Sequence, residues 1–246
     1  MDVRNFLKAG LVCVALAGLA GCGSDDDDPQ QVMGNLAEVA NARGFTALSA
    51  AVAKAGIGTT LTDPGAQLTV FAPTDQAFAA LATRLGFTDA TAMVNALPAS
   101  ALRSILTYHV LGSKKTAADL SAGGSSQATA YAYANAPATL RLDFTGGVKI
   151  TDAVLTTANV VTPDVPASNG VIHAVDKVLV PPGVLNVVQM AQANPQFDSL
   201  VRAVVAADLQ GTLAGAGPFT VFAPTNAAFA AAPQNLTTPQ LRTVLT

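Results

Sequence analysis

The stretch Leu68–Leu81, LTVFAPTDQAFAAL, decides the fold, and a close copy of it returns at Phe219–Ala230 as FTVFAPTNAAFA. Each copy predicts a strand of alternating apolar residues, a short turn and the start of a helix. Pro73 lacks a backbone donor, so the strand ladder must stop there. Thr74 or Asp75 can then cap the new helix, and the carboxylate of Asp75 suits the positive end of the helix dipole. The chain is therefore organised around a repeated strand–turn–helix unit.

The composition is that of a folded protein with one or two hydrophobic cores. Half of the 246 residues are hydrophobic and 12% are charged, which argues against a disordered chain or a nucleic-acid binder. Asp2 and Asp25–Asp28 supply five of the 16 acidic residues, and Arg4 and Lys8 supply two of the 13 basic ones. Eleven of each remain beyond residue 28, so the folded part is formally neutral and offers no steering field for a charged partner.

Residues 1–21 read as a lipoprotein signal peptide. Two basic residues precede the apolar run Ala9–Ala20, which is too short to cross a bilayer but suits the core of a signal peptide. The run ends in Leu-Ala-Gly-Cys at Leu19–Cys22, and this resembles the bacterial lipobox. The resemblance implies that Cys22 is diacylated after export and becomes the first mature residue. The alternative is an ordinary leader with an incidental cysteine.

Residues 22–34 are predicted to be an acidic flexible tether. Gly, Ser, Asp, Pro and Gln dominate this segment, so it has little to bury. The run Asp25–Asp28 lacks the interleaved spacing and closing Glu of an EF-hand loop, and consecutive carboxylates repel one another. We therefore expect no metal there. Gly23 follows the cysteine where an Asp would favour inner-membrane retention, so the resemblance favours the outer membrane.

Residues 35–182 carry the pattern of one complete α+β module. Asn35–Ala55 has apolar residues at spacings of three and four and a break at Arg43-Gly44, which predicts two helices. Helical patterns return at Phe87–Leu97 and Ala101–Leu111, whereas Lys114–Ala122 reads as a loop. Strands are expected at 128–133, 139–144, 148–152, 154–161 and 171–180.

Three stretches in this region resemble the fasciclin domain family. They are TVFAPTDQAF at 69–78, LRSILTYHV at 102–110 and NGVIHAVDKVLVPP at 169–182. The first and third resemble the two signature blocks of the family, and Tyr108-His109 its central Tyr-His pair. The resemblance implies an α+β fold with two angled β-sheets and helices packed around them. It also implies a secreted or surface-anchored protein with a role in adhesion or matrix contact, and no catalytic residues.

Residues 183–246 repeat the beginning of the module and are predicted to be an incomplete second fasciclin-like domain. Phe197 and Leu200 correspond to Phe45 and Leu48, 152 residues earlier, and Leu241–Thr246 matches Leu102–Thr107. A counterpart of the sheet-forming half is absent, which would leave apolar strand and helix faces exposed. We expect this sequence to be a fragment of a longer chain. The alternative is a natural truncation that docks on the first module or on another chain.

The two histidines are expected to be structural. Neither His109 nor His173 has further ligands at zinc-site spacing, and Asp176 follows His173 by three residues, which places the two on opposite faces of a strand. No catalytic, cofactor-binding or metal site is predicted. By resemblance, Tyr108 and His109 are the residues expected either to support the fold or to form a contact site. An Asp-Ile pair used for integrin contact in some animal members is not present, because Lys177 follows Asp176.

Tyr131 and Tyr133 alternate with Thr129 on a predicted strand, so they should share one face. Two such rings suit either a small sugar-stacking or protein-contact patch, or ordinary cross-strand packing, which is the commoner arrangement. The sequence has no GxSxG elbow, and Gly123–Ser126 lacks the Lys and the spacing of a phosphate loop.

Taken together, the sequence predicts a non-enzymatic, lipid-anchored cell-envelope protein whose fasciclin modules mediate adhesion or contacts with matrix or protein. Its expected partners are the membrane, through the anchor, and a protein or polysaccharide, but no nucleic acid. It would face the periplasm or the cell exterior. The alternative is a periplasmic binding protein for a small or polysaccharide ligand, which needs a concave pocket with convergent polar groups. A hydrolase is the third hypothesis.

Overall fold

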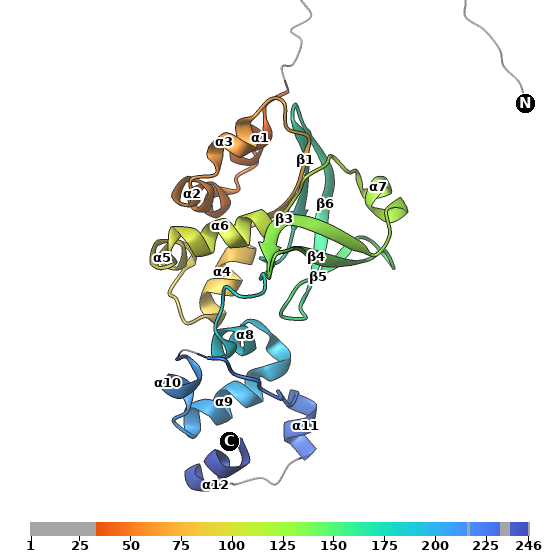
Figure 1. The fold of residues 1–246 in the computed structure, drawn as a ribbon. Coiled ribbons are helices and arrows are strands. Elements are labelled where there is room, and N and C mark those ends of the chain that lie inside the picture. The colour runs from red at the N-terminus through yellow and green to blue at the C-terminus, as the bar shows by residue number, and fades with distance from the viewer. Residues whose placement is uncertain (1–32, 216, 232–236, 246) are drawn as a thin grey trace, which may run out of the picture. The chain divides into compact units, whose positions relative to one another are not determined.

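The computed structural model describes residues 33–215, 217–231 and 237–245 (Figure 1). The predicted signal peptide, Cys22 and residues 22–32 of the tether lie outside the described residues. None of the helices within the described ranges combines the length and the apolar character needed to cross a bilayer. The helices of the first half are α1 (Leu36–Ala42), α2 (Thr46–Ala55), α3 (Gly58–Thr62), α4 (Asp75–Arg84), α5 (Ala90–Ala96), α6 (Ala99–Tyr108) and α7 (Ala117–Ala122). The strands are β1 (Leu68–Pro73), β2 (Val110–Leu111), β3 (Ser126–Tyr133), β4 (Ala136–Asp143), β5 (Lys149–Thr151), β6 (Thr157–Ala167) and β7 (Gly170–Val175).

The seven strands form one sheet in the order β2-β1-β7-β6-β5-β4-β3. β1 and β7 run parallel, from Leu68 opposite Gly170 to Pro73 opposite Val175, and the other pairs are antiparallel. The predicted pair of separate sheets is therefore corrected to a single sheet. β6 joins its two halves, because its start pairs with β5 and the remainder with β7 across two register shifts. Such bulges bend a strand, and β2 and β3 at the two ends of the sheet come close together, so the sheet is barrel-like.

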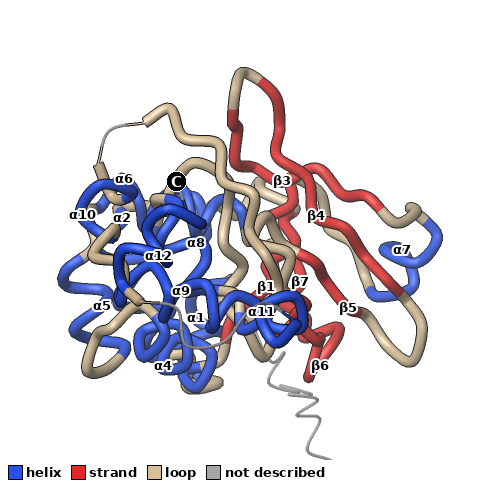
Figure 2. The backbone as a smooth tube through the Cα atoms, turned by 90° about the horizontal axis from the view of Figure 1, so that it is seen from below, coloured by secondary structure: helices blue, strands red, loops and turns tan. Residues whose placement is uncertain are grey.

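Figure 2 shows the helices gathered beside the sheet, with α7 apart from the rest next to the strands. The predicted loop at Lys114–Ala122 is wrong in part, since α7 forms there. Its capping box explains the difference. The Thr116 hydroxyl accepts a hydrogen bond from the backbone of Asp119, and the Asp119 carboxylate accepts one from the backbone of Thr116.

Two predicted strands differ from the observed ones for a common reason. β7 ends at Val175 rather than at residue 180, because the backbone N–H groups of Leu179 and Val180 bond to side chains instead of to a neighbouring strand. β6 begins at Thr157 rather than at residue 154, because the preceding residues form a turn around the Asp152 carboxylate. In both places a buried side chain satisfies the backbone in place of a strand ladder.

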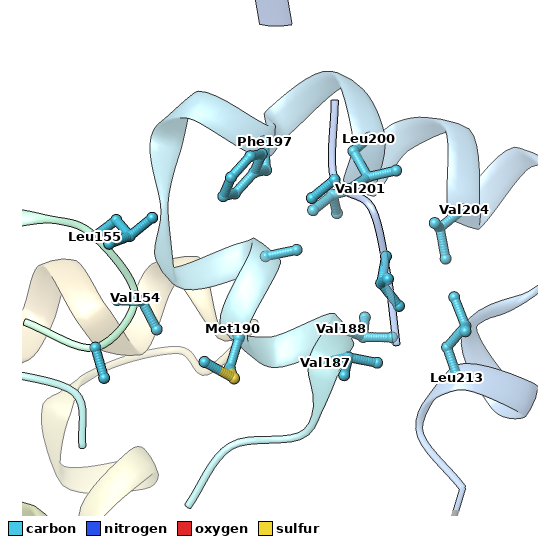
Figure 3. A pocket seen from close by; sticks show the side chains of 14 residues that line it. Val154, Leu155, Val187, Val188, Met190, Phe197, Leu200, Val201, Val204 and Leu213 are labelled. Atoms are coloured by element: carbon cyan, nitrogen blue, oxygen red, sulfur yellow. The ribbon is translucent and has the colours of Figure 1, made fainter. Parts of the chain in front are cut away.

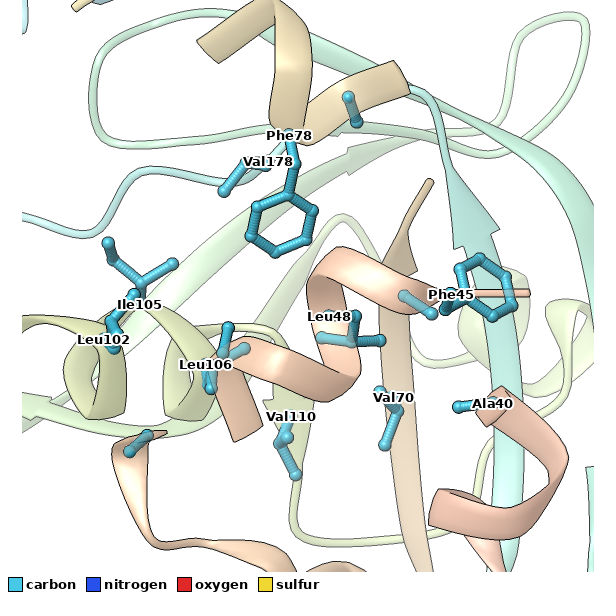
Figure 4. Packing of buried hydrophobic residues seen from close by; sticks show 14 of the residues in the cluster. Ala40, Phe45, Leu48, Val70, Phe78, Leu102, Ile105, Leu106, Val110 and Val178 are labelled. Carbon is cyan, nitrogen blue, oxygen red and sulfur yellow. The ribbon is translucent and has the colours of Figure 1, made fainter. Parts of the chain in front are cut away.

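The core of the module has two parts, on opposite faces of β1. Val70 points to the helices, where it packs near Leu48 and Leu106 (Figure 4). Phe71 points into the curl of the sheet, where it joins a second cluster with residues such as Ile150. Alternation along a strand sends neighbouring side chains to opposite faces, so the strand of the repeated motif is buried on both sides.

Thr74 caps α4, as predicted, by accepting a hydrogen bond from the N–H of Ala77. The carboxylate of Asp75 instead caps a different helix. It accepts hydrogen bonds from the Thr46 hydroxyl and from the N–H of Ala47 at 2.9 Å, at the start of α2, which has no cap of its own. The repeated motif therefore fastens α4 to the helix before it.

The second half of the chain repeats these contacts. It contains α8 (Val187–Ala193), a 3-10 turn η1 (Pro195–Phe197), α9 (Asp198–Ala206), α10 (Gln210–Leu213), α11 (Asn226–Ala231) and α12 (Thr238–Leu245). Asn226 takes the place of Asp75, because its Oδ1 accepts a 2.8 Å hydrogen bond from the N–H of Ser199 at the start of α9. The Arg242 guanidinium bonds the carbonyl of Ala207, as that of Arg103 bonds the carbonyl of Ala55.

The motif strand differs between the two copies. Residues 219–224 form no strand, whereas the equivalent β1 lies between β2 and β7. As a result Phe222 is 93% exposed, while its counterpart Phe71 is fully buried. A small separate cluster of Leu200, Val204, Ala207 and Leu209 holds the second copy together.

Candidate functional site

His109 lies at the end of α6 and is only 1% exposed. Its Nδ1 lies 2.7 Å from the carbonyl oxygen of Ile105, and its Nε2 accepts a 2.8 Å hydrogen bond from the N–H of Leu179. A carbonyl only accepts, so Nδ1 carries the proton and the ring is neutral. Burial lowers the pKa of His109 to about 4, against the smaller opposing effect of the bond to Ile105. The ring thus joins the helix end to the segment after β7.

Tyr108 is also 1% exposed and packs inside the curl of the sheet. Its hydroxyl donates to the carbonyl of Thr139 at 3.2 Å, and its ring meets that of Tyr131 edge-on with centroids 6.2 Å apart. Burial, with a smaller contribution from Asp152, raises the pKa of Tyr108 to about 12. Both side chains of the predicted pair are buried and form hydrogen bonds within the fold.

Asp152 is a third buried polar residue, which the sequence analysis did not single out. It is 5% exposed, and its carboxylate accepts hydrogen bonds from the N–H of Val180 at 3.0 Å and from the N–H and hydroxyl of Thr156 at 2.9 and 3.1 Å. Burial raises the pKa of Asp152, and these hydrogen bonds oppose the rise. The signal in the sequence was a lone carboxylate inside an apolar strand pattern, which is rarely buried without donors.

His173 is fully buried on β7, beside the ring of Phe71. Its Nδ1 accepts a hydrogen bond from the N–H of Asp164, and its Nε2 lies 3.0 Å from the carbonyl of Lys115, so Nε2 carries the proton. The Asp176 carboxylate bonds Asn159 instead. His173 and Asp176 are thus not paired. In both histidines, each ring nitrogen forms a hydrogen bond with a backbone group.

A polar groove of about 330 Å³ is lined by residues of β4 and β5 together with residues of β3, the end of α6 and the segment after β7. Its lining residues are Tyr108, Tyr133, Pro137, Ala138, Thr139, Arg141, Thr151, Asp152, Ala153 and Pro182. Tyr133 is 49% exposed, whereas Tyr131 turns inward and donates from its hydroxyl to the carbonyl of Pro182. The two tyrosines therefore differ in exposure, although they lie against the adjacent residues Pro182 and Gly183. The polar groups available in the groove are instead Tyr133 and the exposed Arg141.

A second, apolar pocket of about 260 Å³ lies between the helices of the second half of the chain and residues 153–155 of the first module (Figure 3). Leu200, Val201 and Val204 of α9 line it together with Val187 and Leu213. The equivalent helices of the first copy enclose a pocket of about 200 Å³, which Ile172 of β7 and Val110 of β2 help to close. The apolar pocket is thus the site where the first copy places its sheet. It contains no titratable side chain.

Comparison with known proteins agrees with this architecture. The fasciclin domain family model matches residues 43–181 and 195–246. The chain is 36% identical to the uncharacterised protein sll1735 of Synechocystis over 60% of this chain and 98% of that protein. It is 38% identical to protein sll1483 of the same organism over 56% of this chain and 68% of that protein.

More distant similarities involve animal proteins. The transforming growth factor-beta-induced protein ig-h3 of Sus scrofa is 31% identical over 68% of this chain and 22% of that protein. A FAS1 domain pair from the insect cell adhesion molecule fasciclin I is 18% identical with a TM-score of 0.39, over 79% of this chain and 60% of that one. With the family model matching most of its length and two signature blocks built into its core, this chain belongs to the fasciclin domain family.

Proposed function

We propose that this protein is a non-enzymatic, lipid-anchored cell-envelope protein whose fasciclin modules mediate adhesion or contact with matrix or protein. The family is associated with roles of the adhesion and extracellular-matrix type. The main support for the proposal is that the buried polar side chains form hydrogen bonds within the fold. His109 and His173 have both ring nitrogens bonded to the backbone, and Asp152 accepts from three donors.

This use of the polar residues supports a binding module rather than an enzyme. A general base must have a free lone pair within hydrogen-bond reach of a substrate, and a nucleophile needs such a base beside it. The lone pair of each histidine is occupied by a backbone N–H, and neither ring is exposed to a substrate. The open groove and the apolar pocket are surface features that suit binding.

The anchoring part of the proposal rests on the Leu-Ala-Gly-Cys motif at Leu19–Cys22. The test is fractionation of host cells that express the native chain or Cys22→Ala. We expect the native chain in the outer-membrane fraction and the variant in the soluble envelope fraction, with Cys13→Ala as a matched control that changes nothing. A Cys22→Ala protein that stays with the membrane would remove the lipid anchor from the proposal.

The adhesion part needs a separate readout. Cells that carry the native chain are expected to attach to a polysaccharide or protein matrix better than cells that lack it, and cells with Cys22→Ala should attach like the latter. Equal attachment by all three would contradict an adhesive role, even if the anchor is present.

A binding protein for a polysaccharide ligand is the second candidate. The groove on β4 and β5 favours it, because its volume of about 330 Å³ falls within the usual range of ligand pockets, roughly 300–1,000 Å³. An adhesion protein and a polysaccharide-binding protein need the same kind of surface, so the two candidates differ in whether the anchored protein holds a cell to the ligand.

A further inference from the structure

We propose that the polar groove at β4 and β5 binds a polysaccharide that carries carboxylate groups, such as a polyuronate. Tyr133 supplies the stacking surface, Arg141 holds the carboxylate, and Thr139 and Thr151 offer hydroxyl groups between them. This inference rests on the proposed function, because it names the class of partner that the module would contact.

The ring of Tyr133 lies close against the backbone of Gly183. A Cβ atom at Gly183 would lie 2.4 Å from the Cε2 atom of Tyr133, and Gly183 has a φ of 76°, a conformation that favours glycine. The ring remains 49% exposed. A half-exposed aromatic ring offers an apolar face on which the C–H face of a pyranose can pack.

Arg141 is the cation of the groove, and its charge is available. In the part of the chain that the structure describes, its guanidinium makes no hydrogen bond or ion pair. Asp143, two residues further on the same strand, binds the N–H of Thr145 and lies opposite Lys149, so other groups compensate its charge. A guanidinium presents a planar fork of donors that matches a carboxylate with two parallel hydrogen bonds.

Asp152 is the acidic residue of the groove, and it does not compete for Arg141. Its carboxylate is 5% exposed and accepts the three hydrogen bonds from Thr156 and Val180. A bound anion would therefore meet one exposed positive charge in the groove and no exposed negative one.

The geometry of the strands suits an elongated ligand. Pro137, Thr139 and Arg141 lie at alternate positions of β4 and so share its outer face, while Leu140 and Leu142 fill the core on the other side. Tyr133 of β3 pairs with Ala136 of β4, and its side chain lines the same groove as Arg141. The five residue steps from Ala136 to Arg141 span roughly 17 Å along β4, which leaves room for linked sugar units rather than a single one.

An extended acidic peptide is less suited to this groove than a polysaccharide. A peptide commonly binds by adding a strand to a free sheet edge. β4 lies between β3 and β5, and β5 lies between β4 and β6, so neither has a free edge here. What remains for a ligand is side-chain chemistry, namely a ring face, hydroxyls and a guanidinium, which matches sugars and their carboxylates.

The test uses the native full-length chain and measures its binding to polygalacturonate, to dextran and to poly-glutamate, by affinity electrophoresis and by calorimetry. We expect binding to polygalacturonate at least roughly tenfold tighter than to either of the others. Absence of binding to polygalacturonate, or equal binding to dextran, would overturn the proposal. Equal or tighter binding to poly-glutamate would overturn it in favour of an acidic protein partner.

Four variants locate the site. Arg141→Ala should abolish the preference for polygalacturonate over dextran, and Arg141→Lys should weaken polygalacturonate binding severalfold, because it keeps the charge but loses the fork. Tyr133→Ala should weaken binding to polygalacturonate by about tenfold. Lys114→Ala removes an exposed charge outside the groove and should change nothing. The three side chains that these variants replace are exposed, so unchanged circular dichroism is expected.

The outcomes separate this inference from the function on which it rests. If Lys114→Ala weakens binding as much as Arg141→Ala does, the binding reflects general charge attraction. That result would contradict the groove as the binding site. Suppose that Cys22→Ala releases the protein from the membrane and that the native chain supports attachment, but that the native chain does not bind polygalacturonate. This result would leave the proposed function standing and would contradict only the polyuronate as its ligand.

Discussion

The Nε2 atom of His109 accepts a 2.8 Å hydrogen bond from the backbone N–H of Leu179, 70 residues later in the chain. The two residues belong to the Tyr-His pair and to the second signature block, so one side chain joins two of the three stretches by which the family is recognised. Both partners are buried, and the ring also donates to the carbonyl of Ile105. The histidine of the Tyr-His pair therefore links two segments that are distant in the sequence.

Replacement of His109 by alanine is expected to destabilise the protein strongly. It would leave the N–H of Leu179 and the carbonyl of Ile105 without partners in the core, and it would open a cavity. The free energy of unfolding should fall by roughly 2–5 kcal/mol. Urea denaturation measures this, with the exposed Lys114→Ala as a control expected to stay within about 0.5 kcal/mol of the native chain. A change as small as that of the control would refute the linking role.

The same histidine should make stability fall in mild acid. Its pKa is about 4 in the folded state, below the ordinary value of 6.5, so the unfolded state binds the proton more readily between these values. The stabilisation from His109 is complete above pH 6.5 and is lost as the pH falls towards 4, by about 3 kcal/mol in all.

The titration of Asp152 acts in the opposite direction, because its raised pKa makes protonation favour the folded state. The measurement is therefore the difference between the native chain and His109→Gln, which keeps a donor and an acceptor but does not titrate. We expect the native chain to lose stability from pH 6.5 to 4 more steeply than the variant. Parallel pH profiles would mean that another group causes the acid sensitivity.

Asp75 should matter as a hydrogen-bond acceptor rather than as a charge. In Asp75→Ala the start of α2 loses its only side-chain cap, which should cost about 1–2 kcal/mol of unfolding free energy. Asp75→Asn should cost much less, because Asn226 makes the same contact with Ser199 in the second copy. Thermal denaturation of the two variants decides between these roles. Equal losses in both would assign the effect to the charge.

Gly170 lies where a strand approaches too closely for any side chain. A Cβ atom there would be 2.2 Å from the carbonyl oxygen of Leu68, the residue that Gly170 faces across β1 and β7. Gly170→Ala should therefore destabilise the module by roughly 3 kcal/mol or more. Gly112→Ala is the matched control, because nothing lies within 4 Å of its Cβ position. Similar melting temperatures for the two variants would show that β1 and β7 can move apart at low cost.

The second copy should open before the first. Its core is the small cluster of Leu200, Val204, Ala207 and Leu209, whereas the first copy has two large clusters and a sheet. Amides of α9 are therefore expected to exchange hydrogen sooner than those of the equivalent α2. Leu200→Ala should accelerate exchange in the second copy alone, and Leu48→Ala should affect the first. Equal protection of α9 and α2 from hydrogen exchange in the native chain would contradict the prediction that the second copy opens before the first.

The order of helices and strands follows largely from local signals in the sequence. The apolar spacing and the Gly44 break predict α1 and α2, and Pro73 and Thr74 mark the end of β1 and the start of α4. The repeat at an offset of 152 residues predicts the helices of the second copy, as α9 shows. These features depend on neighbouring residues, whose propensities and caps act over a few positions.

The candidate site could not be found in the same way. Tyr131 and Tyr133 look equivalent in the sequence, yet Tyr131 is partly buried against Tyr108 whereas Tyr133 is exposed, and the register of β3 shifts between Ala128 and Ala132. Arg141 carried no signal at all, because its importance depends on which residues surround it. Asp75 was expected to serve its own helix, but α2 lies close enough to take its carboxylate.

The amino-acid sequence was sufficient to predict the family, the repeated motif and the order of most elements. Only long-range packing places the strands in one sheet, bonds the His109 and Asp152 side chains to the backbone of Leu179 and Val180, and brings Arg141 and Tyr133 to one groove. The physical reason is the range of the interactions. Helix caps and apolar periodicity act between near neighbours, whereas a groove and a buried hydrogen bond depend on how distant segments pack.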